Sequence, residues 1–234
     1  SAPTGRTIIP GAFDTEPLSS ATTGSCHVRR LAYRAVDRQW VICDPRTLDR
    51  PILGWAVVGP GQTFMTTLLT GRIGNGPAAI ATADVPDLHH FRGSYGAKDV
   101  IPLHRDASGT PNVDPSLLAT IQRYINPEIT AEDLFAYCYG VLAGADYTSR
   151  FADELEVPGP RIPITLDQDL FQEMTTHGRT LLAIHTWHER FQSGLGGEST
   201  VNSRVRWVRE PTMLPESTRS CSYDPVNESL QVGD

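Results

Sequence analysis

The hydrophobic pattern of this chain changes once, near residue 110, and that change limits the possible folds more than any other feature. From Val28 to Leu103, short apolar or alternating runs are separated by turn residues, as is typical of strands. After the polar turn at 106–112, apolar residues recur at helical spacing. Strands followed by helices indicate the α+β class. We therefore predict a β-rich body over 28–112 and a helical subdomain over 113–192.

Two helices of the second part have clear start signals. Asp114-Pro115 opens the first, because aspartate caps a helix and proline fits its first turn. Thr130 and Asp133 have the spacing of a capping box and open the second. These signals place two amphipathic helices directly after the β-rich body.

The remaining boundaries follow from breakers and from composition. A short helix is predicted over 147–155 and a long one over 167–191, separated by the proline-rich stretch 158–163, which excludes helix. Residues 1–27 form an irregular lead-in, and 193–234 form a linker with a small C-terminal β-hairpin. The runs that predict strands in this tail are Arg204–Val208, Thr218–Tyr223 and Ser229–Val232.

Charge divides the chain at the same place as the hydrophobic pattern. The net charge is −7, which by itself disfavours binding to phosphate backbones or anionic membranes. Residues 1–110 hold 11 basic and 9 acidic side chains, a net +2, whereas residues 111–234 hold 9 and 18, a net −9. The β-rich half is therefore the better candidate for contact with a polyanion.

Cysteine usage and hydropathy favour a protein of the reducing cytoplasm. The four cysteines are scattered, with no C-x-x-C pair that would indicate a zinc site or a disulfide framework. The longest apolar stretch, Phe135–Ala145, is far shorter than the roughly 20 residues that cross a bilayer. We expect no membrane partner.

No catalytic signature is present, and a metal site is a weak alternative. The sequence lacks a P-loop, G-x-S-x-G, H-E-x-x-H and a paired-carboxylate pattern. Asp87, His89, His90 and His104 could supply metal ligands, although neighbouring residues in a strand point to opposite faces. A structural or a DNA-contacting histidine remains the preferred interpretation, so we predict neither a catalytic residue nor a metal site.

The most basic stretch lies at the start of the β-rich body. Strand alternation would place Arg30, Arg34 and Arg38 on one face, as a basic stripe that follows phosphates. Internal ion pairs with nearby aspartates, such as Asp37, Asp44 and Asp49, are the alternative. The six arginines of this stretch are Arg29, Arg30, Arg34, Arg38, Arg46 and Arg50.

Several strings in this order resemble one family. YRAVDRQW at 33–40, followed by DPR and DRP, resembles a segment after the methyltransferase core of Type I single-polypeptide restriction-modification enzymes. VPDLHHFRGSY at 85–95, AEDLFAYCYGVL at 131–142 and PRIPI at 160–164 are similar to later segments of that family, and the ending YDP at 223–225 with LQVGD at 230–234 is similar to its actinobacterial branch. Ala35-Val36 stands where the family has Pro-Phe, and His104 where it has Tyr.

The resemblance implies a target recognition domain that reads duplex DNA and is not itself catalytic. Methyl transfer from S-adenosylmethionine to adenine would belong to a methyltransferase domain or subunit outside this chain, and no cofactor is expected here. The alternatives are a protein-interaction module that docks on a methyltransferase or translocase partner and, less favoured, a metal-dependent hydrolase. Charge and position select these predicted DNA contacts: Arg34, Arg38, Arg46, Arg50, Arg72, His90, Arg92 and Lys98.

Overall fold

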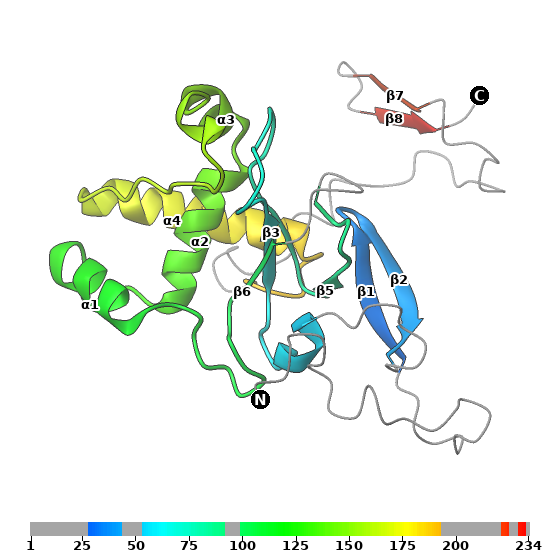
Figure 1. Cartoon of the computed structure of the whole chain (residues 1–234), viewed down its shortest axis with the longest axis horizontal. Helices are drawn as coiled ribbons and strands as arrows, with labels where there is room; N and C mark the ends of the chain where they lie inside the picture. Colours follow the sequence, from blue (N-terminus) through cyan, green and yellow to red (C-terminus); the bar gives the residue numbers. More distant parts are fainter. Residues whose placement is uncertain (1–27, 44–52, 92–98, 193–220, 225–228, 233–234) are drawn as a thin grey trace. The chain divides into compact units, whose positions relative to one another are not determined.

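The computed structural model describes residues 28–43, 53–91, 99–192, 221–224 and 229–232. They fall into two compact units, 1–196 and 197–234, which are treated separately. In its described residues the first unit contains two three-stranded sheets and four α-helices (Figure 1). Strands precede helices along this unit, so the predicted α+β class is confirmed.

The first sheet is a hairpin with one added strand, in the order β2-β1-β5. β1 and β2 are antiparallel, whereas β5 runs parallel to β1. Ala32 of β1 is 2% exposed, so its face of the hairpin packs against the body. The strands of the unit are β1 (Val28–Arg34), β2 (Asp37–Ile42), β3 (Phe64–Thr67), β4 (Ile80–Thr82), β5 (Val85–Pro86) and β6 (Asp99–Pro102).

The second sheet has the order β4-β3-β6, and both pairings are antiparallel. All four residues of the central strand β3 are buried. Its two threonine hydroxyls remain satisfied, because Thr66 donates to the Ile80 carbonyl at 3.2 Å and Thr67 donates to the Ala78 carbonyl at 2.7 Å. A polar strand centre is thus accommodated inside the core.

Both predicted helix starts are confirmed. The Asp114 carboxylate accepts hydrogen bonds from the backbone N–H groups of Ser116 and Leu117. Thr130 and Asp133 exchange the two bonds of a capping box. The helices are α1 (Pro115–Tyr124), α2 (Ala131–Ala143), α3 (Ala145–Arg150) and α4 (Gln168–His185).

Helices α2 and α4 pack with their backbones in contact at two glycines. A Cβ atom on Gly178 would lie 1.8 Å from the carbonyl oxygen of Ala136, and one on Gly140 would lie 2.8 Å from that of Met174. Any larger residue at Gly178 would therefore force the helices apart. Leu142, Phe135 and Leu182 extend this contact into the main hydrophobic core.

Tyr139 of α2 joins the helices to the second sheet. Its hydroxyl accepts a hydrogen bond from the backbone N–H of Ala81 in β4, at 3.1 Å, and also bonds to Nδ1 of His185 at the end of α4. The ring is fully buried within the core. One side chain thus fixes the sheet, α2 and the end of α4 relative to one another.

The proline-rich stretch before α4 contains no helix, bends at Gly159, where φ is 91°, and is held by two further tyrosines. Tyr137 donates to the Pro163 carbonyl at 2.8 Å and accepts from the Thr165 N–H. Tyr147 donates to the Arg161 carbonyl at 2.8 Å and accepts from the N–H of the same residue. The two tyrosine hydroxyls thereby satisfy backbone N–H and C=O groups that have no partner in a helix or a sheet.

Two helices and one predicted strand differ from the prediction. The helix expected over 167–191 ends at His185, and the one expected over 147–155 breaks into α3 and the 3₁₀ turn η3 (Glu154–Glu156). Within the predicted β-rich body, the apolar run Trp55–Val58 was expected to be a strand. It lies mostly in the 3₁₀ helix η2 (Leu53–Val57). Short apolar runs do not distinguish a strand from a buried turn of helix.

In the second unit, β7 (Cys221–Asp224) and β8 (Ser229–Val232) pair antiparallel. The pairing brings Tyr223 opposite Leu230. The predicted strand at Arg204–Val208 lies outside the described residues.

The close contact between Gly178 and the Ala136 backbone leads to a prediction about the stability of the fold. Gly178→Ala should lower the free energy of unfolding by about 3 kcal/mol, because the new methyl group meets backbone rather than a movable side chain. Gly144→Ala is the matched control: its nearest neighbour would be 3.7 Å away, so a change within about 0.5 kcal/mol is expected. Urea unfolding measures both, and equal stabilities of the two variants would contradict the close helix contact.

Candidate nucleic-acid interface

Arg30 and Arg38 lie on the same face of the β1–β2 hairpin as buried Ala32. Arg30 is two positions before Ala32 in β1, and Arg38 pairs directly with Ala32 across the hairpin. The predicted shared face is therefore present for these two arginines. It is the face that packs against the body, so both guanidinium groups meet other segments of the protein.

Two carboxylates from other segments hold these guanidinium groups. Glu189, which follows α4, accepts hydrogen bonds from both terminal nitrogens of Arg30, at 2.9 and 2.6 Å, and from Nη1 of Arg38 at 2.7 Å. Asp84, which lies between β4 and β5, is 3.4 Å from Nε of Arg30 and accepts from Arg38 at 3.3 Å. We call these four residues the hairpin ion cluster.

The hairpin ion cluster stays charged at neutral pH. Burial by itself would raise the pKa of Glu189, but hydrogen bonds and positive charge from Arg30 and Arg38 outweigh it and lower that pKa. The hydrogen bond to Glu189 raises the pKa of Arg30. The two positive and two negative charges balance, so this cluster adds no net charge to the surface.

Ion pairing, the alternative that the sequence left open for these arginines, is present with unexpected partners. The sequence suggested Asp37, Asp44 and Asp49, of which the last two lie outside the described residues. The observed partners Asp84 and Glu189 are distant along the chain; Glu189 is 151 residues from Arg38. Nothing in the local pattern could have indicated them.

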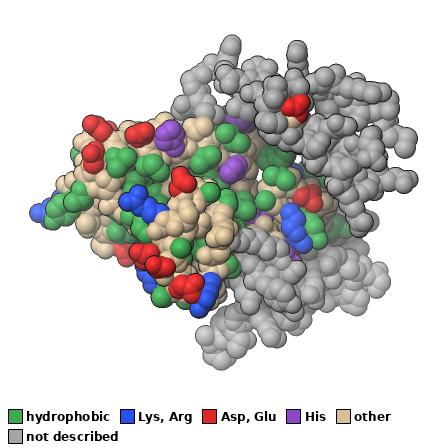
Figure 2. Space-filling view, turned by 90° about the horizontal axis from the view of Figure 1, so that it is seen from above, with side chains coloured by type: hydrophobic (Ala, Val, Ile, Leu, Met, Phe, Trp, Pro, Cys, Tyr) green, Lys and Arg blue, Asp and Glu red, His purple; other side chains and the backbone are tan. Residues whose placement is uncertain are grey.

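Acidic and basic side chains are mixed over the surface that Figure 2 shows. Among the coloured residues on that face, the Arg side chains lie apart from one another, several of them beside Asp or Glu, and form no continuous basic area. The mixture agrees with the excess of acid in residues 111–234. A DNA-binding role therefore depends on particular cations more than on the overall field.

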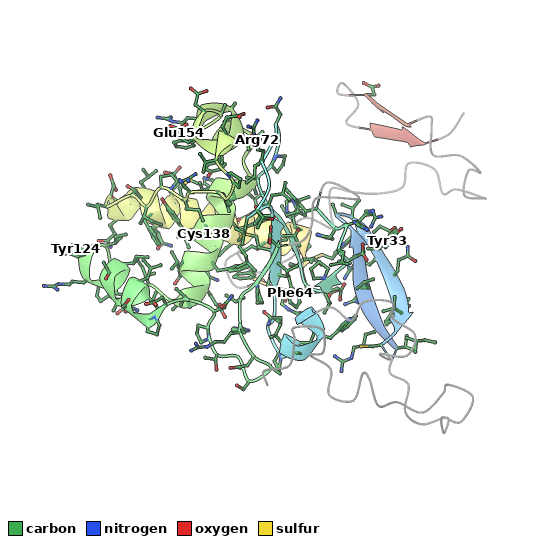
Figure 3. The ribbon with its side chains drawn as sticks, viewed as in Figure 1. Tyr33, Phe64, Arg72, Tyr124, Cys138 and Glu154 are labelled. Carbon is green, nitrogen blue, oxygen red and sulfur yellow. The ribbon has the colours of Figure 1, made fainter. Side chains whose placement is uncertain are left out.

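Arg34 and Arg72, two of the predicted DNA contacts, lie in different places. Arg34 is 3.2 Å from the Asp87 carboxylate, 3.9 Å from the centre of the Tyr33 ring and 37% exposed in its side chain. Arg72 is 71% exposed and pairs with Glu156 at 2.6 Å. Figure 3 shows Arg72 beside α3, away from Tyr33 on the hairpin. Arg34 and Arg38 share the hairpin, and Arg72 does not join them.

His90, another predicted DNA contact, is an interior residue. Its side chain is buried, and Nδ1 lies 3.0 Å from the Thr66 hydroxyl. Because Thr66 gives its proton to the Ile80 carbonyl, Nδ1 must donate, which leaves Nε2 as a buried acceptor without a hydrogen-bond partner among the described residues. Burial lowers the pKa of His90 to about 4. The ring is thus neutral and supports β3 from inside, the structural interpretation that the sequence had left open.

The other predicted contacts, Arg46, Arg50, Arg92 and Lys98, lie outside the described residues, so their contact with DNA stays a prediction. Sequence reasoning did not select two exposed tryptophans near the hairpin ion cluster. The Arg38 guanidinium lies 4.8 Å from the centre of the Trp187 ring, and that of Arg30 lies 5.9 Å from the Trp40 ring.

The described residues contain no group of three or more His, Cys, Asp or Glu side chains placed to hold a metal ion. Asp87 instead accepts a hydrogen bond from the backbone N–H of His89 and pairs with Arg34. A search of the described helices for one long and apolar enough to span a membrane also finds none.

Comparison with known proteins places the chain in a family. Residues 15–226 match the family described as the Type ISP C-terminal specificity domain, and the chain belongs to that family. The resemblance found in the sequence is confirmed. Among solved structures, the fold is similar to a chain in a cryoEM structure of a DrdV–DNA complex, with a TM-score of 0.56 and 22% identity. The alignment covers 68% of this chain and 16% of that one, and no curated protein matches the sequence.

Burial of His90 predicts an acid-sensitive stability. The unfolded chain binds a proton at His90 near its ordinary pKa of 6.5, but the folded chain does so only near 4. The stability that the folded chain gains by keeping His90 neutral is therefore complete above pH 6.5. It is lost as the pH falls toward 4, which lowers the free energy of unfolding by up to about 3 kcal/mol.

Urea unfolding between pH 7 and pH 4 measures this slope. His90→Asn should be less stable at neutral pH and should lose that part of the slope, whereas the control His177→Asn changes an exposed side chain and should keep it. An unchanged slope in His90→Asn would show that other groups cause the acid sensitivity.

Proposed function

We propose that this chain recognises a specific sequence in duplex DNA, as the specificity domain of a restriction-modification adenine methyltransferase. The observation that carries the proposal is the family match over residues 15–226. The likeness in fold to a chain of a DNA-bound complex supports it. Charge adds a physical reason, because the cations of the β-rich half lie in a segment with a net positive charge.

Arg34 is the strongest candidate for a phosphate or base contact among the described residues. Its guanidinium is stacked on Tyr33 and paired with Asp87, yet more than a third of the side chain is open to solvent. Its hydrogen bonds to other described residues, the Tyr33 carbonyl and Asp87, both come from Nη1 and fix its orientation. Such a group can make a bidentate contact with guanine or a phosphate.

In this proposal the methyl-transfer reaction takes place outside this chain. The chain supplies no catalytic residue and binds no cofactor; S-adenosylmethionine binds to a methyltransferase domain or subunit that works with it in the cytoplasm. The helical half has 18 acidic and 9 basic residues over 111–234, which disfavours phosphate contact. We propose that α1, α2 and α3 of this half face the protein partner, while the β-rich half and the segment after α4 that is bonded to the hairpin face DNA.

Sequence recognition is tested by selection. Duplexes of randomised sequence are mixed with the chain, and the bound fraction is recovered and sequenced over several rounds. Specific recognition predicts enrichment of one short motif. Retention of duplexes without any enriched motif would leave only non-specific binding, and failure to retain DNA would reject the proposal.

Arg34→Gln tests the proposed cation directly. If Arg34 contacts a phosphate, the variant should bind duplex DNA more weakly and lower the slope of log affinity against log salt by about 0.9. Asp87→Asn is the matched control, because it breaks the same ion pair but keeps the Arg34 charge and the oxygen that accepts from His89.

Fluorescence anisotropy over a series of salt concentrations measures both variants of this pair. Weaker binding by Arg34→Gln alone supports a contact made by the cation. Equal loss in both variants would assign the effect to the ion pair, and no loss in either would exclude Arg34 from the interface.

A further inference from the structure

Helix α4 ends in a Schellman motif, a backbone arrangement that closes a helix with two characteristic hydrogen bonds. With Thr186 as the C-cap, the N–H of Trp187 donates to the carbonyl of Ile184 at 3.0 Å. The N–H of His188 donates to the carbonyl of Ala183 at 2.7 Å. These are the two bonds that define the motif.

The residue at the centre of this motif is unusual. A Schellman motif needs a left-handed residue directly after the C-cap, and glycine usually fills it because it has no Cβ. Here the position is Trp187, with φ of 56°, and His188 follows with φ of 58°. A bulky side chain is strained in this region, so glycine would serve the backbone better.

Burial of Trp187 is only partial. The Trp187 side chain is 52% exposed, and among the described residues its ring contact is with the Arg38 guanidinium. A tryptophan that packs into a core would gain much more from the removal of apolar surface from water. Neither backbone geometry nor core packing therefore explains why this position carries an indole.

The hairpin ion cluster makes a firm base for the ring. Arg38 under Trp187 is 18% exposed in its side chain and is held by both Asp84 and Glu189. Arg30, held by the same Glu189, lies against Trp40, which is 71% exposed. Two exposed indoles thus lie on two guanidinium groups whose charges are already balanced. This surface offers aromatic faces rather than free cations.

We propose that Trp187, assisted by Trp40, is a stacking surface for a base of the bound DNA. The inference rests on the proposed function, since it names the contact that the domain makes. In a duplex a base offers its flat π-face where a base step is opened or a base is flipped out, and a tryptophan ring mounted on arginine can stack on that face and offset part of the cost of opening. In this arrangement Arg38 positions the indole and does not itself contact a phosphate.

Trp187→Gly separates this role from a structural one, because the two roles predict opposite effects. Glycine relieves the left-handed strain, so the melting temperature should stay the same or rise. Loss of the ring should weaken binding to a fluorescent duplex of randomised sequence by about tenfold, as expected for one aromatic–base contact. Trp187→Phe, which keeps an aromatic face, should retain most of the affinity.

Tyr124→Ala is the matched control, because Tyr124 is also exposed and also lies against an arginine, but on α1 in the helical layer (Figure 3). It should bind DNA like the unmodified chain. Stacking also predicts that DNA quenches indole fluorescence more strongly in the unmodified chain than in Trp187→Phe.

The outcomes separate this inference from the function on which it rests. If the unmodified chain does not bind the duplex, the proposed function fails. If it binds and Trp187→Gly binds equally well, only the stacking role is overturned. A lower melting temperature of Trp187→Gly, or equal quenching in Trp187→Phe, would also overturn that role.

Discussion

The direct backbone contact between α2 and α4 positions most of the first unit. With Gly140 and Gly178 at the crossing, the helices approach closely enough for Tyr139 to reach β4 and the end of α4 together. The end of α4 is fixed further where Arg190 donates to the Gln62 carbonyl at 2.9 Å. The segment after the helix is therefore held firmly enough to receive the hairpin.

The hairpin is attached to that segment by charge as well as by packing. Hydrophobic burial on its inner face is limited, since Ala32 is small, and the ion cluster adds directed contacts to two other parts of the chain, at Asp84 and Glu189. Partly buried pairs of this kind add little net stability, because desolvation offsets much of the attraction. Their effect is on orientation: four groups with mutual partners permit few positions of the hairpin.

Local rules predicted the parts of the fold that depend on local interactions. The caps at Asp114 and Thr130 and the absence of helix over the proline-rich stretch 158–163 depend only on neighbouring residues, and all three were confirmed. The end of α4 was placed too late because its stop signal has Trp187 where glycine is usual. The sequence pattern therefore looked helical past the point where the backbone turns left-handed.

The candidate site was harder to predict, because its arginines were visible but their partners were not. Charge and alternation correctly placed Arg30 and Arg38 on one face, but only the tertiary structure brings Glu189 to them. The sequence left open whether these arginines are free cations or internal ion pairs, and the partners it suggested are aspartates close in sequence rather than Asp84 and Glu189. In the folded chain the balanced pairs leave the neighbouring aromatic rings as the exposed feature of this surface.

This difference changes which residues can carry recognition at the hairpin. A guanidinium that lies between two carboxylates has its charge already balanced, so a phosphate that approaches it also meets two negative charges and gains little. An indole resting on that guanidinium gives up only water when it stacks. On the proposed stacking role, the favoured contact at this surface is therefore aromatic, and Arg34, whose side chain is 37% exposed, is the cation proposed to meet the polyanion.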